Sequence, residues 1–352
     1  MTNNAASAAG PTAGASSATA TMTAVVQHHY GQPQRVLRLA EVERPRVGDD
    51  DVLIRVRATS VNTPDLVVVT GEPRILRLKT GLRRPGTAIR GSDVAGVVAA
   101  VGGNVAELRS GDEVFGSVWD NEPVQQTGTF AAFTVAPVGQ VARKPDGLSF
   151  VEAAASVMAG ITALSAIRDV ADVRQGTRVL INGASGGVGT MAVQIAAALG
   201  AEVTGVCGTR NVELVRSLGA HHVIDYTEAD YTKGEERYDV VLDNVMNHPP
   251  AATARVVAPG GTFIPNSIGT SGGLLGALPR TARASLLGRR GTFRVGLATC
   301  EVNHENLTAL GTLLATGDVK VVVDDTYPLE RAAQAVAHML GHHTRGKVAI
   351  TV

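Results

Sequence analysis

The chain has 352 residues, enough for about two domains, and its 32 Lys and Arg residues balance its 32 Asp and Glu residues. This zero net charge provides no electrostatic reason to expect a nucleic acid or an anionic membrane as a partner. Two cysteines exclude a disulfide-based fold and a four-thiolate zinc site. We expect a glycine-rich, soluble α/β protein of the reducing cytoplasm, whose apolar stretches are too interrupted to span a bilayer.

Residues 1–21 are predicted to form a disordered tail. The first twenty contain no charged residue and no Leu, Ile, Val or Phe. A secretory signal needs a basic start and an apolar middle, and a transit peptide normally carries arginines, so neither is expected. A segment of this composition cannot bury enough apolar surface to fold.

Residues 22–147 have the pattern of a mostly β module. Short β-rich runs are divided by turn-forming Gly, Pro and Asp, and they read TAVVQHHYG, VLRLAEV, DVLIRVRATSV, DVAGVVAAVGGNV, GDEVFGSV and GTFAAFTVAP. The third run alternates apolar and charged residues, which is typical of a strand with one buried face.

From residue 148 the pattern changes to alternating helices and strands. The segment SFVEAAASVMAGITALSAI predicts a helix with Ser149 as its N-cap and Glu152 completing a capping box. The strand RVLING precedes the helix VGTMAVQIAAALG, which Gly200 should end. Strands AEVTGVCG, HHVIDY, YDVVLDNV and GTFIPNS follow, with helical segments between them. This alternation predicts right-handed βαβ crossovers and a parallel sheet over residues 148–299.

The pattern changes once more over residues 300–352. ENLTALGTLLATG and ERAAQAVAHMLG are helical, whereas VKVVVDDTYPL and GKVAITV are extended. A last strand that returned to the first module would make that module discontinuous, although periodicity alone does not establish this.

The strongest chemical signal is the loop between the strand RVLING and the next helix. It fits G-x-G-x-x-G with Ala184 in the first glycine's place, and its residues are Ala184, Ser185, Gly186, Gly187, Val188 and Gly189. Ala184 should permit the tight turn, Gly186 the approach of a pyrophosphate, and Gly189 the close packing of helix and strand. The helix N-terminus then offers free N–H groups and a positive dipole to the phosphates.

The end of the next strand indicates which dinucleotide binds. An NAD site needs Asp or Glu there for the ribose 2′-hydroxyl, but this strand runs into Thr209 and Arg210, and its first acid is Glu213 in the following helix. A hydroxyl and a guanidinium suit a 2′-phosphate instead. The sequence therefore predicts NADPH (NADP), although Arg210 as an ordinary exposed arginine is the alternative.

These blocks, in this order from Thr23 to the terminal GKVAITV, resemble the medium-chain dehydrogenase/reductase superfamily. Within it, the chain most resembles the zinc-free quinone oxidoreductase-like (zeta-crystallin-like) branch. The resemblance implies an α/β fold with a discontinuous GroES-like β-barrel domain and a Rossmann domain with a doubly wound parallel sheet. The barrel domain would comprise 22–147 and 300–352, and the Rossmann domain 148–299. It also implies a small-molecule substrate bound between the domains, and a homodimer.

The resemblance also indicates whether this chain has the residues of a zinc site. Zinc-dependent relatives carry Cys shortly after the second strand and Gly-His-Glu at a second block, where this chain has Asn62 and Gly91-Ser92-Asp93. Its cysteines, Cys207 and Cys300, lie outside the first module. Asn and Ser are poor zinc ligands beside thiolate and imidazole, so no catalytic or structural metal is expected.

Zinc-free relatives typically pass hydride from nicotinamide to a quinone or to the β-carbon of an enone, and hydrogen-bond donors meet the charge that develops on oxygen. Asn62 is the candidate donor, with a structural role as the alternative. Asp65 is the second candidate catalytic residue, and we expect it to order its loop rather than transfer protons. The aromatic that often follows is replaced by Leu66 and Val67, which favours protonation by solvent or a quinone acceptor.

Further site residues follow from the resemblance. The predicted cofactor contacts are Thr162, Tyr226, Asn244, Val245, Asn266, Ser267 and Lys347, and the predicted substrate-pocket residues are Leu66, Val67, Trp119 and His248. A packing role is the alternative for Tyr226 and Trp119, and a structural role for Lys347. For residues 269–296, a solvated helix and loop is favoured over a cover for the cofactor.

We therefore expect an NADPH-dependent, zinc-independent oxidoreductase acting on a quinone or an α,β-unsaturated carbonyl. One alternative is a tailoring reductase for a natural-product intermediate. An alternative of another class is a non-catalytic NADPH-binding sensor or binding protein.

Overall fold

The computed structural model describes residues 20–119, 128–268, 274–341 and 344–352. The predicted tail lies outside the described residues up to residue 19, and Thr21 already begins the first strand. The strands are β1 (Thr21–Gln27), β2 (Leu37–Glu43), β3 (Asp51–Ser60), β4 (Asp93–Val101), β5 (Glu113–Ser117), β6 (Phe133–Pro137), β7 (Val141–Arg143), β8 (Arg178–Asn182), β9 (Glu202–Cys207), β10 (His222–Asp225), β11 (Tyr238–Asp243), β12 (Val257–Pro265), β13 (Arg294–Val295), β14 (Val323–Pro328) and β15 (Lys347–Thr351).

The helices connect and cover these strands. They are α1 (Pro33–Val36), α2 (Thr63–Thr70), α3 (Arg77–Thr80), α4 (Phe150–Leu164), α5 (Gly187–Ala198), α6 (Val212–Ser217), α7 (Pro250–Thr253), α8 (Leu278–Arg290), α9 (His304–Thr316) and α10 (Ala332–Leu340). A 3₁₀ turn, Arg74–Leu76, leads into α3, and a π-helical segment, Ser165–Val170, extends α4.

Strands from the first part of the chain and from its C-terminal end form the GroES-like part. Strands β14-β15-β3-β4-β5-β7 lie in that order in a seven-stranded sheet in which β6 also pairs with β3, and β1 and β2 form a separate antiparallel pair. The alternation in β3 is real: Ile54 and Val56 are buried, whereas Arg55 and Arg57 between and after them are exposed. The predicted half-buried strand is therefore confirmed.

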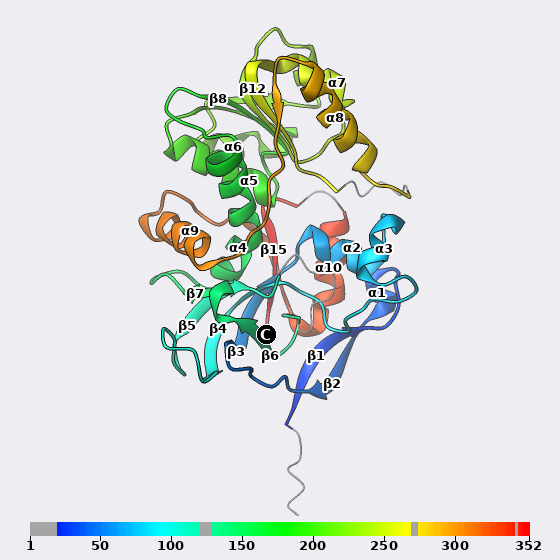
Figure 1. Cartoon of the computed structure of the whole chain (residues 1–352), viewed down its shortest axis with the longest axis vertical. Helices are drawn as coiled ribbons and strands as arrows, with labels where there is room; N and C mark the ends of the chain where they lie inside the picture. The colour runs from blue at the N-terminus through cyan, green and yellow to red at the C-terminus, as the bar shows by residue number, and fades with distance from the viewer. Residues whose placement is uncertain (1–19, 120–127, 269–273, 342–343) are drawn as a thin grey trace, which may run out of the picture.

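The middle of the chain forms a six-stranded parallel sheet in the order β10-β9-β8-β11-β12-β13. Both faces are covered, α5 and α6 lying on one side and α7 and α8 on the other (Figure 1). Successive residues of β8 serve the two faces, because Val179 and Ile181 pack with α4 and α5, whereas Leu180 packs with Ala284 of α8. This is the Rossmann-like doubly wound arrangement.

Helix α4 is the central element of the core. Ser149 Oγ accepts a hydrogen bond from Glu152 N at 3.2 Å and Ser149 N donates to Glu152 Oε2 at 3.0 Å, which confirms the predicted capping box. The run Phe150–Val170 is long and apolar enough to cross a bilayer, with a mean hydropathy of 1.7, contrary to the expectation that every apolar stretch is too interrupted. Of the 18-residue window of this run to which that hydropathy refers, 83% is buried inside the fold, so packing in the core explains its apolar character.

The end of the chain returns to the first sheet. Strand β15 pairs with β3 in antiparallel register, with Ala349 opposite Ser60. Helix α9 packs on α4 so closely that a Cβ on Gly160 would lie 2.6 Å from Leu310 Cδ1. Strand β15 lies at the junction of the barrel and the Rossmann-like part (Figure 1), and Gly346 N donates to Ser185 O at 2.8 Å. The C-terminal strand therefore joins the barrel to the nucleotide loop.

Candidate active site

The predicted phosphate loop lies between β8 and α5, and its geometry explains its glycines. A Cβ on Gly189 would lie 2.0 Å from Gly183 O, so only glycine fits there. The residue with the left-handed backbone is Gly183, with φ of 77°, and not Ala184. The prediction that Ala184 makes the tight turn is therefore wrong: Ala184 is a fully buried packing residue, and the glycine of the turn precedes it.

The loop has room for a phosphate-bearing ligand. A Cβ on Gly186 would meet only Gly183 O, at 3.5 Å, so the backbone is open on that side. Helix α5 has twelve residues and begins at Gly187, so the N–H groups of Gly187, Val188 and Gly189 are those that a helix leaves unpaired. The Ser185 hydroxyl, in turn, accepts from Asn211 Nδ2 at 3.1 Å. These features fit a dinucleotide pyrophosphate.

A second group of predicted residues gathers where β9 and β10 end. Thr209 and Arg210 are exposed, and Tyr226, 56% exposed, lies against Gly208. Sequence reasoning missed Asp225, because it precedes Tyr226 on a later strand and only sheet pairing places it beside Cys207. Hydrogen bonds from Thr209 and then from Thr227 hold the pKa of Asp225 below its ordinary value.

Facing the phosphate loop, the barrel contributes a buried polar cluster built on Asn62, Asp93 and Lys347. Asn62 Nδ2 donates to Asp93 Oδ2 at 2.8 Å and approaches Ser60 Oγ at 3.4 Å, while Asn62 Oδ1 accepts from Lys347 Nζ. Lys347 Nζ also donates to Val61 O at 2.9 Å. Both amide hydrogens of Asn62 thus have acceptors inside the protein, which favours its structural role over the predicted role of donor to a substrate.

Asp65 lies beside this cluster at the first turn of α2. Its Oδ2 accepts from Asn62 N at 2.8 Å and its Oδ1 from Gly91 N at 3.2 Å, so it orders two loops. Burial raises the pKa of Asp65 to about 7 and also raises that of Asp93. Burial lowers the pKa of Lys347, whereas the carboxylates of Asp93 and Asp65 oppose that shift.

Lys347 connects the two halves of the site. Its ammonium is in the barrel cluster, yet a Cβ on Gly187 of the phosphate loop would lie 2.8 Å from Lys347 Cδ. The backbone of Gly346 bridges to Gly186 in the same place. The sequence suggested Lys347 as a cofactor contact, and the structure puts its alkyl chain against the phosphate loop.

Thr162 lies in the last turn of α4 and is buried. Its Oγ1 donates to Met158 O at 2.7 Å, and the Cys300 thiol lies 3.9 Å from the same oxygen. Met158 N in turn approaches Asp93 Oδ2 at 3.4 Å. Burial raises the pKa of Cys300 to about 12, so this thiol stays protonated. Cys300 was not among the predicted site residues.

Asparagines follow the carboxyl ends of β8, β11 and β12, where open α/β sheets bind ligands. Asn266 Nδ2 donates to Asn244 Oδ1 at 2.7 Å, and Asn244 Nδ2 donates to Asn182 O at 3.2 Å. Val245 lies beside Gly183, where a Cβ would be 2.8 Å from Val245 Cγ2, and Ser267 is the second-last residue of the described segment 128–268. Asn182 is the member that sequence reasoning missed.

The predicted substrate-pocket residues do not come together. Leu66 is buried in the barrel core with Val61 and Val69, and Val67 is buried on the same helix, so the prediction that Leu66 lines an open pocket is wrong. His248 packs edge-on against Tyr231, 5.0 Å between ring centroids, and its Nε2 lies 3.7 Å from Asp230 Oδ1.

Trp119 is half-buried, and its N donates to Ser117 Oγ at 3.1 Å. The neighbouring residues 120–127 lie outside the described part.

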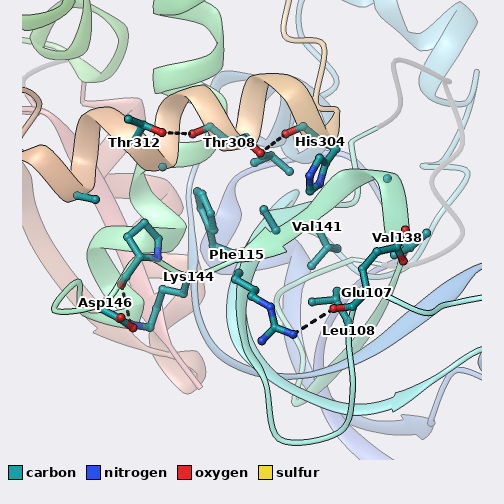
Figure 2. Close-up of a pocket in the computed structure, with 17 residues that line it drawn as sticks. Glu107, Leu108, Phe115, Val138, Val141, Lys144, Asp146, His304, Thr308 and Thr312 are labelled. Carbon is teal, nitrogen blue, oxygen red and sulfur yellow. Dashed lines mark hydrogen bonds between the residues drawn. The ribbon is translucent and has the colours of Figure 1, made fainter.

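A cavity of about 560 Å³ lies elsewhere, between α9 and the strands β5 and β7 (Figure 2). Polar wall groups bind one another: Arg143 Nη2 donates to Glu107 O at 3.0 Å, and Thr312 Oγ1 donates to Thr308 O at 2.9 Å. Because it shares no residue with the phosphate loop or the Asn62 cluster, we do not place the reaction there.

Comparison with known proteins agrees with this architecture. The alcohol dehydrogenase GroES-like domain family matches residues 48–146, and the zinc-binding dehydrogenase family matches residues 218–350. A zinc-type alcohol dehydrogenase-like protein of Schizosaccharomyces pombe is 33% identical, with 94% of this chain and 96% of the relative covered. The quinone oxidoreductase of Pongo abelii is 32% identical, with 93% and 97% covered.

Among solved structures, the quinone oxidoreductase of Escherichia coli complexed with NADPH superposes with a TM-score of 0.78 at 25% identity, and 94% of this chain and all of that chain are covered. The parallel sheet with its phosphate loop, the GroES-like part and these relatives agree. The chain belongs to the medium-chain dehydrogenase/reductase superfamily, in its quinone oxidoreductase-like branch, and is an NAD(P)H-dependent oxidoreductase.

Proposed function

We propose that the protein is an NADPH-dependent, zinc-independent reductase that transfers hydride to a quinone or to the β-carbon of an α,β-unsaturated carbonyl. The observation that carries this proposal is the cluster of Asn62, Asp93 and Lys347. A lysine ammonium is held by Asn62 Oδ1 and Val61 O, with its alkyl chain beside Gly187 of the phosphate loop. A resident ammonium and a buried amide form a poor site for Zn²⁺, which prefers thiolate and imidazole ligands.

The described residues also lack an obvious set of metal ligands. No group of three or more His, Cys, Asp or Glu side chains is arranged to hold a metal ion within those residues. Without a Lewis acid, reduction of an unactivated ketone has no electrophile, whereas a quinone or an enone is already activated. This supports an activated acceptor as the substrate class.

The exposed residues around Thr209 support NADPH rather than NADH as the cofactor. Arg210 and Tyr226 are exposed beside it, and Asp225, the nearby carboxylate, is engaged by Thr209 and Thr227. A guanidinium with hydroxyl donors is suited to a phosphate monoester. NADPH would therefore bind with its pyrophosphate on the loop 184–189 and its 2′-phosphate at this group.

The chain's own residues have distinct tasks in this proposal. The bound nicotinamide supplies the hydride. The phosphate loop and Lys347 hold the cofactor against the barrel. Asn62 and Asp65 are positioning residues, since their polar atoms bind Asp93, Lys347 and backbone N–H groups. Protons for the reduced product come from solvent.

The substrate class is tested by measuring NADPH and NADH oxidation with benzoquinones, 2-enals and simple ketones, with and without a chelator. We expect turnover of quinones or enals with NADPH, unaffected by the chelator. Turnover of simple ketones that the chelator abolishes would refute zinc independence. Tight NADPH binding without turnover of any acceptor would favour the non-catalytic sensor instead.

The cofactor preference is tested with Arg210→Ala. Loss of one charge-assisted hydrogen bond to the 2′-phosphate costs about 1.5–3 kcal/mol, so KM for NADPH should rise roughly tenfold or more while KM for NADH stays constant. Arg216→Ala is the control, because Arg216 is exposed on α6 and pairs with Glu213. An equal rise of both KM values would contradict the assignment.

A further inference from the structure

The zero net charge conceals an uneven distribution along the chain. Residues 66–92 contain six Lys and Arg and a single acid, Glu72, and residues 244–300 contain six Arg and no acid. The rest of the chain therefore holds 31 of the 32 acidic residues. A whole-chain sum cannot reveal such an asymmetry, and a local field depends on where the charges lie.

The two basic segments meet in space at one flank of the molecule. Ile75 N donates to Leu274 O at 3.0 Å, and a Cβ on Gly276 would lie 2.6 Å from Pro73 Cγ. Helix α8 stands directly above α3 on this flank (Figure 1). We call residues 74–84 together with residues 274–290 the basic rim.

The basic rim adjoins elements that carry residues of the candidate site. Arg280 of α8 donates to Met246 O, in the loop that follows β11, and Met246 is the neighbour of the predicted cofactor contact Val245. On the barrel side, the rim continues from α2, which begins at the Asn62 cluster. A surface that bound the rim would therefore lie near the proposed active site.

The solvent-facing side of the rim is apolar as well as basic. Leu78, Leu82 and Leu274 are 69%, 67% and 64% exposed. On α8, the residues Leu278, Ala282 and Leu286, spaced by four, form an exposed stripe, whereas Ala284 on the opposite side is buried. A solvated helix normally presents polar residues along its exposed side, so this stripe is unpartnered.

Arginines border the stripe; Arg74 and Arg77 pair with Glu72 at 3.3 and 3.9 Å, whereas residues 274–290 contain no acid. Arg283, Arg289 and Arg290 are exposed on α8, and Arg83 and Arg84 are exposed just after α3. Exposed leucines flanked by arginines are typical of surfaces that insert into the interface of an anionic bilayer. A second copy of this chain that placed its own rim against this one in a symmetric contact would bring the same positive charge and be repelled.

We propose that the basic rim docks on an anionic lipid bilayer, with its leucines in the acyl boundary and its arginines at the phosphate headgroups. The exposed leucines and arginines of the rim together provide the apolar and cationic groups that such a bilayer binds. The docking does not depend on the proposed reaction. If that reaction holds, docking would place the proposed active site near the bilayer in which a lipid-soluble quinone or enone resides.

The test is flotation of the full chain with vesicles of phosphatidylcholine alone and with 30% phosphatidylglycerol, at about 0.1 M salt. We expect binding only to the anionic vesicles, weakened at about 0.5 M salt. Arg283→Glu/Arg290→Glu should weaken binding by roughly a hundredfold or more, since each lost cation near the surface is worth about fivefold and each added anion repels further. Leu78→Ser/Leu82→Ser should weaken binding to the anionic vesicles without changing how strongly that binding depends on salt.

The control is Leu39→Ser/Arg46→Glu, which alters an exposed leucine and an exposed arginine near β2, away from the rim. This variant should float like the wild type. Failure of the wild type to float with anionic vesicles, or equal binding by rim and control variants, would overturn the proposal. The proposal would also be overturned if the wild type bound an acidic protein but no vesicles. It would equally be overturned if a rim variant converted a dimer into monomers and left flotation unchanged.

Turnover of a soluble acceptor separates this proposal from the proposed function. The rim variants should keep the wild-type rate with NADPH and a water-soluble benzoquinone, because no altered residue belongs to the phosphate loop or the Asn62 cluster. Loss of flotation with that rate retained would support docking. A chain that floats but turns over no acceptor would refute the reaction and leave the docking intact.

Discussion

The two sides of the candidate site are built by different physical means. The nucleotide side uses backbone: a left-handed Gly183, an open Gly186 and the N-terminus of α5. The barrel side uses buried side chains, with Asp93, Asn62 and Lys347 far apart in sequence but in direct contact. A backbone site tolerates only small residues, whereas a buried charged cluster depends on every partner being present. Substitutions on the two sides should therefore have different effects on stability and on cofactor binding.

The largest effect is expected on the barrel side, from Lys347→Met. Removing one partner of a buried charged network costs about 3–5 kcal/mol, because Asp93 and the Asn62 carbonyl lose their cation. Urea unfolding should show this loss, and Lys347→Arg should recover part of it. Lys320→Met, at an exposed lysine, is the control. A loss of less than about 1 kcal/mol would mean that the cluster is not a charged network.

On the nucleotide side, Gly189→Ala should destabilise the fold by about 1–3 kcal/mol, because its Cβ would overlap Gly183 O. It should also abolish NADPH binding measured by fluorescence titration, since α5 must shift. Gly139→Ala is the control, as a Cβ there meets nothing within 4 Å. Normal NADPH affinity in Gly189→Ala would show that the loop does not hold the cofactor.

The pH dependence of stability should report on the barrel side. The pKa of Asp65 rises from 3.8 to about 7 on folding, so the folded state binds the extra proton between these values. Its contribution to stability is complete below about pH 4 and is lost as pH rises to 7, by up to about 1.4 kcal/mol per pH unit. Asp65→Asn should reduce the pH dependence of the unfolding free energy between about pH 4 and pH 7. An unchanged slope would place the titration elsewhere.

The smallest effect is expected at the adenine end, from Tyr226→Ala. Because Tyr226 is 56% exposed and lies against Gly208, its removal should leave stability within about 0.5 kcal/mol. Loss of one contact with the 2′-phosphate should raise Kd for NADPH by roughly three- to tenfold and leave Kd for NADH unchanged. Equal changes for both cofactors would assign Tyr226 to adenine packing.

Local signals were sufficient for much of this protein. The capping box at Ser149, the end of α5 at Gly200 and the alternation in β3 depend on residues within a few positions of one another, and the structure has them as predicted. The phosphate loop belongs with them, apart from the exchange of Gly183 for Ala184 as the turn glycine. The prediction for Ala184 was wrong because the motif was aligned by the positions of its glycines, whereas the backbone conformation determines which residue makes the turn.

Contacts between distant residues were beyond such signals. Lys347 reaches Asn62 across 285 positions, and Ile75 reaches Leu274 across nearly two hundred, because β15 pairs with β3 and because the segment before α8 contacts the barrel. Periodicity reports which side of a strand or helix is buried, not which element covers it. The amino-acid order therefore specifies the strands, helices, family and phosphate loop through local geometry. The occupied amide of Asn62, the buried position of Leu66 and the gathering of arginines on one flank arise only when the chain folds back on itself.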